Sequence, residues 1–293
     1  MKYCVSNWIY YNEPLQGVMQ RAKSAGCDGL ELMGEPQIYD VDEVCQLVDK
    51  YELPIYSVAG VFTPERDLSA LEPNMRHQAI KYCIAALDFT KAIGAQQLVV
   101  LPNYVYKVKP DGEIIGTESW NIAHRRDWKN VVEAVCKVAD HADKTGIILA
   151  IEPLNRYETY LINTLNQVLV FIQEVNAPCM RIQLDTFHMN IEEIEPWNAI
   201  RKAGNLLVSL HLSDSNRMAL GRGNLDFRGM MRALKEIRFD GLLTLEPLVP
   251  CPNPNVAMLM TEDKKLLEHI LEDSLATLRV AAQTTFDDLS RAY

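Results

Sequence analysis

The sequence lacks several features that mark whole classes of protein. Its longest apolar runs have the length of a β-strand, far below the roughly 20 residues that a helix needs to cross a bilayer. No two cysteines form a CxxC motif, and no glycine-rich phosphate loop follows the first expected strand. A basic surplus is also missing, because the formal net charge is −10. These absences argue against a membrane protein, a thiolate metal site, a doubly wound nucleotide-binding sheet and a nucleic-acid partner.

The first residues and the cysteines favour a cytoplasmic protein. The opening MKYCVSNWIYY runs straight into an expected strand and has no signal-peptide architecture. The cysteines are seven, an odd number, and they are scattered along the chain. This usage is typical of reduced thiols in a cytosolic protein. We therefore expect a cytoplasmic location.

Short apolar runs alternate with amphipathic stretches along the whole chain. Residues 14–26 open with proline and close with glycine, as a helix with a glycine C-cap does, and further helices are expected at 127–146, 163–175 and 229–237. The expected strands lie near 3–8, 29–33, 55–61, 98–101, 147–152, 181–185, 206–211 and 242–246. Eight strand–helix units predict an α/β fold, a (β/α)8 TIM barrel that forms a single domain over residues 1–293.

Two segments interrupt this rhythm. Residues 102–126 form a long connection whose centre, VKPDGEI, has the composition of a hairpin turn, and we expect a hairpin-containing lid there. Residues 247–263 form a proline-rich loop after the eighth strand. Both segments follow strands, so both are expected on the face of the barrel that carries active sites.

Four successive strands, the fifth to the eighth, end in a side chain that can bind a metal. These residues are Glu152, Asp185, His211 and Glu246, each about one strand–helix unit after the last. In a barrel the carboxyl ends of the strands meet on one face. A single polar residue there is more often a loop start or a helix cap, but four in succession favour a shared site.

These side chains predict a divalent cation. Three carboxylates crowded together would repel one another and raise their pKa values, and burying them unpaired is costly. An oxygen-rich set with one imidazole favours a hard or borderline ion over a zinc ion held by thiolates. We expect one divalent ion per subunit, with Mn²⁺ favoured and Co²⁺ or Mg²⁺ as alternatives.

The segments around these residues resemble a known family. The chain resembles the xylose-isomerase-like sugar epimerases and isomerases, most closely the ketose 3-epimerases typified by D-tagatose 3-epimerase and D-allulose (psicose) 3-epimerase. The resemblance covers nearly the whole chain. The matching segments are EPLNRYET, DTFHMNIEE, HLSDSNR, GRGNLDF and LEPL. One departure is Arg222, where the family often has histidine.

The resemblance implies the roles of individual residues. The metal ligands would be Glu152, Asp185, His211 and Glu246, and the substrate oxygens near C1 and C2 would contact Glu158, His188 and Arg217. Trp8 and Trp120 are further candidates for the wall of a sugar pocket, although ordinary packing explains them equally well.

The chemistry that follows is epimerisation of a free ketose at C3 through a metal-stabilised enediolate. Glu152 and Glu246 would be the acid/base pair, one on each side of the sugar, while Asp185 and His211 would be mainly structural ligands. The resemblance also implies a homodimer or a homotetramer, with a small-molecule sugar as the substrate.

Other functions fit the same residues. An aldose–ketose isomerase, or an epimerase or dehydratase acting on a cyclitol or a keto-glycoside, could use the same metal site. An apurinic-site endonuclease fits less well, because such enzymes bind several zinc ions through many histidines and this chain has six. A non-catalytic sugar-binding barrel is the alternative outside the enzymes.

Overall fold

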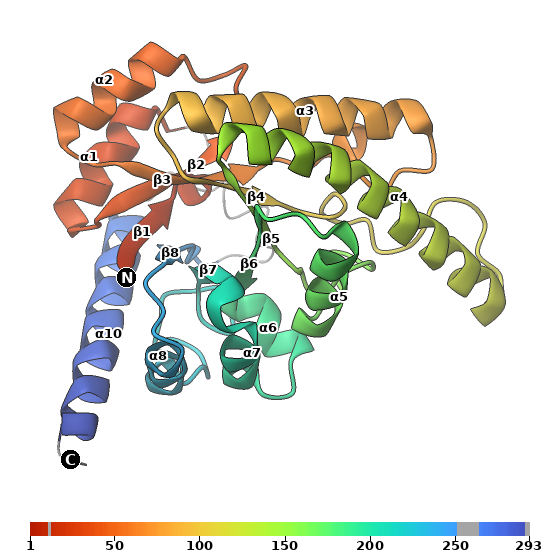
Figure 1. The fold of residues 1–293 in the computed structure, drawn as a ribbon. Helices are drawn as coiled ribbons and strands as arrows, with labels where there is room; N and C mark the ends of the chain where they lie inside the picture. The colour runs from red at the N-terminus through yellow and green to blue at the C-terminus, as the bar shows by residue number, and fades with distance from the viewer. Residues whose placement is uncertain (11–12, 251–263, 291–293) are drawn as a thin grey trace. The chain divides into compact units, whose positions relative to one another are not determined.

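Eight parallel strands, in the order β1 to β8, close into a barrel in the computed structural model, which describes residues 1–10, 13–250 and 264–290 (Figure 1). All eight predicted strands are present within a few residues of their expected positions, so the TIM-barrel prediction is confirmed. The strands are β1 Lys2–Ser6, β2 Gly29–Gly34, β3 Ile55–Gly60, β4 Gln97–Val100, β5 Ile148–Ile151, β6 Met180–Asp185, β7 Leu207–Leu212 and β8 Leu242–Leu245.

Helices follow the strands, as the alternation of the sequence predicted. The α-helices are α1 Leu15–Ala25, α2 Val41–Tyr51, α3 Pro73–Ala92, α4 Gly116–Thr145, α5 Leu165–Val175, α6 Thr186–Glu192, α7 Pro196–Ala203, α8 Phe227–Glu236 and α10 Lys264–Ser290. Short 3-10 helices lie at η1 Asn7–Tyr10, η2 Pro64–Arg66 and η3 Gly204–Leu206. In the described parts of the chain, every helix is too short or too polar to cross a membrane.

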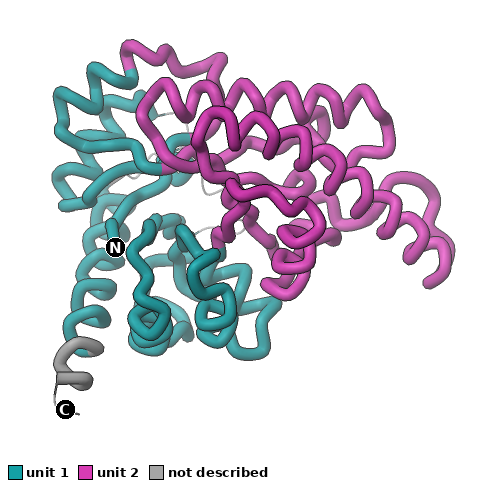
Figure 2. Tube along the Cα trace, in the orientation of Figure 1, with its two compact units in different colours: residues 1–32, 44–56, 184–293 teal, residues 33–43, 57–183 magenta. Residues whose placement is uncertain are grey.

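The chain divides into two compact units, which Figure 2 shows in two colours. Unit 1 consists of Met1–Leu32, Val44–Tyr56 and Leu184–Tyr293, and unit 2 consists of Met33–Glu43 and Ser57–Gln183. The predicted extent of a single domain over residues 1–293 stays a prediction.

Unit 1 contains four neighbouring strands in the order β2–β1–β8–β7. Parallel pairing joins β1 to β2 and to β8, and β8 to β7. Leucines of these strands contribute to the core, and Leu30, Leu243 and Leu245 are fully buried. Helix α10 packs against α1 and α8 through apolar side chains such as Leu271 and Leu278.

Unit 2 contains the parallel pairs β3–β4, β4–β5 and β5–β6. Helices α3 and α4 lie side by side in it (Figure 1). Helix α5 begins at a capping box, in which the Thr164 side chain accepts from the Gln167 backbone and the Gln167 side chain accepts from Thr164. The sequence predicted this helix within two residues of its start.

The predicted hairpin within residues 102–126 is wrong. The described segment contains turns up to residue 115 and one isolated bridge, Lys107 to Thr159, while α4 already begins at Gly116. Tertiary contacts explain the difference. The Lys107 ammonium is buried and bonds to Asp67 and Asp111, so the turn residue Asp111 is held by an ion pair rather than by a second strand. The proposed role of this segment as a lid stays a prediction.

The proline-rich loop and the cysteines are only partly within the described residues. Residues 251–263 of the predicted proline-rich loop 247–263 lie outside the described residues. Six of the seven cysteines are described, and these six form no disulfide, in line with the reduced thiols expected from the scattered cysteine pattern.

Candidate active site

Three predicted site residues lie together at the carboxyl ends of strands β6, β7 and β8. Asp185 is the last residue of β6, His211 lies near the end of β7, and Glu246 directly follows β8. All three side chains are buried. The His211 Nδ1 atom is 3.4 Å from Glu246 Oε2. The strand ends therefore bring ionisable side chains into contact inside unit 1, as the sequence analysis expected.

Arg217 joins two of these carboxylates. Its Nη1 donates to Asp185 Oδ2 at 2.6 Å and its Nη2 donates to Glu246 Oε2 at 3.0 Å. The backbone of Arg217 has a φ of +61°, an unusual conformation for a residue other than glycine. Backbone hydrogen bonds hold this conformation, because the Arg217 amide donates to the Asp214 carbonyl and the Leu248 amide donates to the Arg217 carbonyl. The side chain is thus fixed between the loops that follow β7 and β8.

Asp185 has a second role as the N-cap of α6. Its Oδ1 accepts from the backbone amides of Phe187 at 2.6 Å and His188 at 3.2 Å. The His188 Nε2 atom is 3.8 Å from Asp185 Oδ2. Burial of Asp185 opposes its ionisation, but the charges of Arg217, His188 and His211 prevail and lower its pKa to about 2. Asp185 is therefore a carboxylate at any ordinary pH.

Glu246 has the opposite electrostatic balance. Burial raises the pKa of Glu246 to about 7, although the charges of His211 and Arg217 lower it. The negative charges of Glu31 and Asp185 act in the same direction as burial. Glu246 therefore ionises at a higher pH than an ordinary glutamate, mainly because it is buried.

Two aromatic rings lie against Arg217. Its guanidinium carbon is 5.5 Å from the centre of the Trp8 ring and 5.0 Å from the centre of the Phe187 ring. Both distances are within the range of a cation–π interaction. Trp8, a weak candidate from the sequence, is thus in contact with the site residues of unit 1, and Phe187 is a neighbour that the sequence analysis missed.

Glu31 is the other site residue that the sequence analysis missed. It lies within β2, its side chain is fully buried, and its Oε1 atom is 2.8 Å from His211 Nε2. The sequence signal that could have indicated this residue is the carboxylate inside the apolar run GLELMG. Glu31 lies within its strand, whereas the predicted site residues end or follow theirs.

These side chains fit a divalent cation. Ligand atoms of Glu31, His211 and Glu246 lie within 4.8 Å of one another. His211 Nδ1 faces Glu246, whereas Glu31 Oε1 already contacts the other ring nitrogen, Nε2. Carboxylate oxygens and an imidazole nitrogen suit hard and borderline ions. The donor set of unit 1, with Asp185 beside it, can therefore hold a metal.

The remaining predicted residues belong to unit 2. Glu152 directly follows β5, is buried, and accepts from Gln183 Nε2 at 3.2 Å. Glu158 accepts from Asn155 Nδ2 at 2.9 Å. Trp120 lies in α4, not in a loop, and its ring packs edge-on against Tyr160 with the ring centres 5.8 Å apart.

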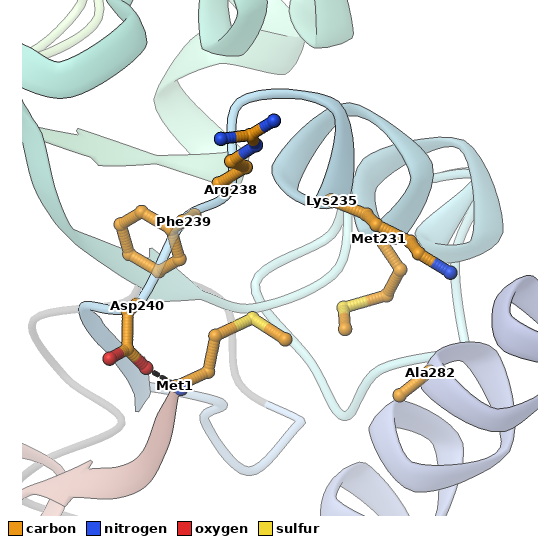
Figure 3. Close-up of a pocket in the computed structure, with 7 residues that line it drawn as sticks. All are labelled: Met1, Met231, Lys235, Arg238, Phe239, Asp240 and Ala282. Atoms are coloured by element: carbon orange, nitrogen blue, oxygen red, sulfur yellow. Dashed lines mark hydrogen bonds and ion pairs between the residues drawn. The ribbon is translucent and has the colours of Figure 1, made fainter.

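A separate pocket lies near the amino ends of β1 and β8, at the opposite end of these strands from Glu246 (Figure 3). Its volume is about 480 Å³. The lining residues are Met1, Met231, Lys235, Arg238, Phe239, Asp240 and Ala282. The pocket shares no residue with the candidate site.

Comparison with known proteins defines the class of this protein. Residues 19–269 match the family described as xylose isomerase-like TIM barrel, and the chain belongs to that family. The family assignment agrees with the closed barrel and with the polar side chains at its strand ends.

The relatives within this class are sugar epimerases. The chain is 33% identical to the L-ribulose 3-epimerase of Methylomonas sp. (strain DH-1) over 77% of this chain and 75% of the relative. The structure of D-psicose 3-epimerase from Clostridium cellulolyticum H10 with D-tagatose is similar with a TM-score of 0.85 and 26% identity, over 96% of this chain and 99% of that one. A 3-keto-D-glucoside 4-epimerase from E. coli is similar with a TM-score of 0.78 and 25% identity, over 96% and 99%.

These relatives confirm the expectation of an enzyme. Ketose 3-epimerases belong to the isomerase class, and the resemblance inferred from the sequence is to the same group.

Proposed function

We propose that the protein is a ketose 3-epimerase that interconverts C3 epimers of a free ketose with the help of a divalent cation. The observation that carries the proposal is the buried cluster of Asp185, Arg217, His211 and Glu246 at the strand ends. The named activities of the relatives support the reaction type.

Four residues form the proposed ligand set, namely Glu152, Asp185, His211 and Glu246. Glu152 is included because the carboxyl ends of strands in a closed barrel lie at one end of it. The donor chemistry supports Mn²⁺, with Co²⁺ or Mg²⁺ as alternatives. When bound, such a cation polarises a ketone oxygen and makes the neighbouring C–H more acidic.

Glu246 and Glu152 are proposed as the acid/base pair. Epimerisation at C3 requires one group to remove the proton and another to return a proton from the opposite side of the sugar. Each glutamate directly follows its strand and is buried, so water competes little for its carboxylate. Arg217 fixes the direction of the Glu246 carboxylate by its hydrogen bond. General acid/base catalysis of this kind contributes about 10²–10⁴-fold to a rate.

The substrate oxygens near C1 and C2 are proposed to contact Arg217, His188 and Glu158. Arg217 and His188 are side chains of unit 1 that already lie beside Asp185. Glu158 is oriented by Asn155 in the loop after β5. Trp8 and Trp120 stay weaker candidates for the wall of the sugar pocket.

The test is proton exchange in D₂O. Ketoses are incubated with the protein and Mn²⁺, and NMR reports the product and the deuterated carbon. We expect deuterium at C3, loss of turnover after exhaustive chelation, and recovery with Mn²⁺ or Co²⁺. Full activity in the chelated protein would contradict the metal-dependent mechanism.

A second candidate is epimerisation of a keto-glycoside. The similarity to the 3-keto-D-glucoside 4-epimerase favours it, because that likeness covers nearly the whole of both chains. The same experiment run with a 3-keto-glycoside separates the two functions, because its C3 carbonyl acidifies the neighbouring C4–H and a 4-epimerase would place deuterium at C4. An aldose–ketose isomerase would instead move the carbonyl group to another carbon. A protein that binds sugar without catalysis would show no deuterium exchange.

The expectations of a homodimer or homotetramer and of a cytoplasmic location stay predictions. Size-exclusion chromatography with light scattering would measure the first of these directly.

A further inference from the structure

A glutamate in the middle of a strand contacts the histidine of the proposed ligand set. Glu31 lies in β2, three residues before the end of that strand, and its side chain is 0% exposed. Its Oε1 atom is 2.8 Å from His211 Nε2. Glu31 was not among the residues that the family resemblance assigned, so its role follows from the geometry alone.

The contact crosses the interior of unit 1. The strand order β2–β1–β8–β7 places two strands between the backbone of Glu31 and that of His211. Because β2 and β7 are not paired with each other, the Glu31 and His211 side chains meet across the inner face of the sheet. Both are buried, so water screens their hydrogen bond little.

This bond determines which imidazole nitrogen carries the proton. The ionised carboxylate of Glu31 can only accept a hydrogen bond, so with this form of Glu31 the donor is His211 Nε2. In the neutral ring the lone pair is then on Nδ1, the atom that lies 3.4 Å from Glu246 Oε2. The nitrogen that carries the lone pair in this form thus faces Glu246, another proposed ligand.

We propose that Glu31 is a positioning residue that holds His211 in the Nε2-protonated form, with Nδ1 directed at the cation. The inference rests on the proposed metal-dependent function. Carboxylates that accept from metal-binding histidines orient the ring and raise the basicity of the nitrogen that binds the metal. Glu31 would act on the metal through His211, not as a ligand.

The experiment measures Mn²⁺ affinity and the His211 tautomer separately. Isothermal titration gives the Kd of the wild type, Glu31→Gln and Glu31→Leu. Nitrogen-15 NMR of metal-free protein gives the tautomer, and the His211 signal is the one that is lost in His211→Asn. The matched control is Asp127→Asn, another fully buried carboxylate, which accepts from Tyr160 and Arg126 in unit 2.

Glu31→Leu should weaken Mn²⁺ binding about 10–100-fold, the usual effect of removing such a partner. It should also turn the single His211 tautomer of the wild type into a mixture. Glu31→Gln should have a smaller effect, because its amide oxygen still accepts from Nε2. Asp127→Asn should keep the wild-type affinity.

The two readouts separate the possible failures. An Nδ1-protonated His211 in the wild type would overturn the positioning role. Equal losses of Mn²⁺ affinity in Glu31→Gln and Glu31→Leu, with an unchanged His211 tautomer, would also overturn it. That result is expected if Glu31 binds the metal itself. A wild type that binds no Mn²⁺ would instead refute the proposed function, while the tautomer data would still decide what Glu31 does. Should Glu31→Leu fail to fold, the His211 tautomer of the wild type still tests the positioning role.

Discussion

Two buried ionic clusters, one in each unit, differ in how their charges are balanced. The strand-end cluster of unit 1 consists of Glu31, Asp185, His211, Arg217 and Glu246. The lysine cluster of unit 2 consists of Asp67, Ser69, Lys107 and Asp111. In the lysine cluster the buried carboxylate of Asp67 meets one buried ammonium at 2.6 Å and two donors of Ser69. Asp111 adds a second contact, but its side chain is 40% exposed and reaches water.

The strand-end cluster is balanced differently. Its three buried carboxylates, Glu31, Asp185 and Glu246, face the guanidinium of Arg217 and the imidazoles of His188 and His211, which are charged only when protonated. Buried charge is costly unless it is paired. The buried carboxylate of Asp67 meets a permanent cation, so the lysine cluster fits a structural role. Buried carboxylates that depend on imidazoles for part of their balance fit a cation site instead.

The strongest test of the difference between the strand-end cluster and the lysine cluster is the substitution Glu246→Gln. The amide keeps the size of the side chain but can no longer act as a base, so kcat should fall about 10²–10⁴-fold. Steady-state kinetics with the preferred ketose measure the loss, and circular dichroism checks the fold. The control is Glu236→Gln, which removes an exposed partner of Arg201 and should leave kcat unchanged. Near-normal turnover in Glu246→Gln would remove Glu246 from the proposed acid/base pair.

The lysine cluster should respond in stability and not in catalysis. Lys107→Met leaves the Asp67 carboxylate buried without its cation, and this should lower the free energy of unfolding by about 3–5 kcal/mol. Denaturation by urea measures the change. The folded variant should bind Mn²⁺ with the wild-type Kd.

Asp111→Asn is the matched variant for this cluster. It removes the exposed partner of Lys107 and should cost no more than about 1 kcal/mol. If Lys107→Met were as stable as Asp111→Asn, the lysine cluster would not be the structural element that its balanced charges indicate.

Much of the fold could be predicted because the barrel repeats one simple pattern. Short apolar runs gave all eight strands, and glycine in the left-handed conformation ends α1 at Gly26 and α4 at Gly146, where the sequence placed the helix ends. The segment 102–126 failed because its local composition favours a hairpin, while the ion pairs of Lys107 come from residues far away in the sequence. Contacts of that kind leave no periodic signal.

The site was predictable to the extent that it lies at strand ends. Asp185, His211 and Glu246 were found because an ionisable residue stops an apolar run, and the structure brings them together. Glu31 was missed because a glutamate within a strand gives no information on what it faces until the strand order is known. Likewise, the stacking of Phe187 on Arg217 depends on the turn at Asp185.

The smallest expected effect concerns the aromatic wall beside Arg217. Trp8→Leu keeps an apolar side chain but removes the ring that lies 5.5 Å from the guanidinium. A cation–π contact contributes about 0.5–1 kcal/mol at such sites, so KM should rise about two- to fivefold while kcat changes little. Phe187→Leu, which removes the second ring, is the matched comparison and should act in the same direction. A fall in kcat without a change in KM would mean that Trp8 acts on the acid/base geometry and not on the position of the proposed substrate-binding arginine.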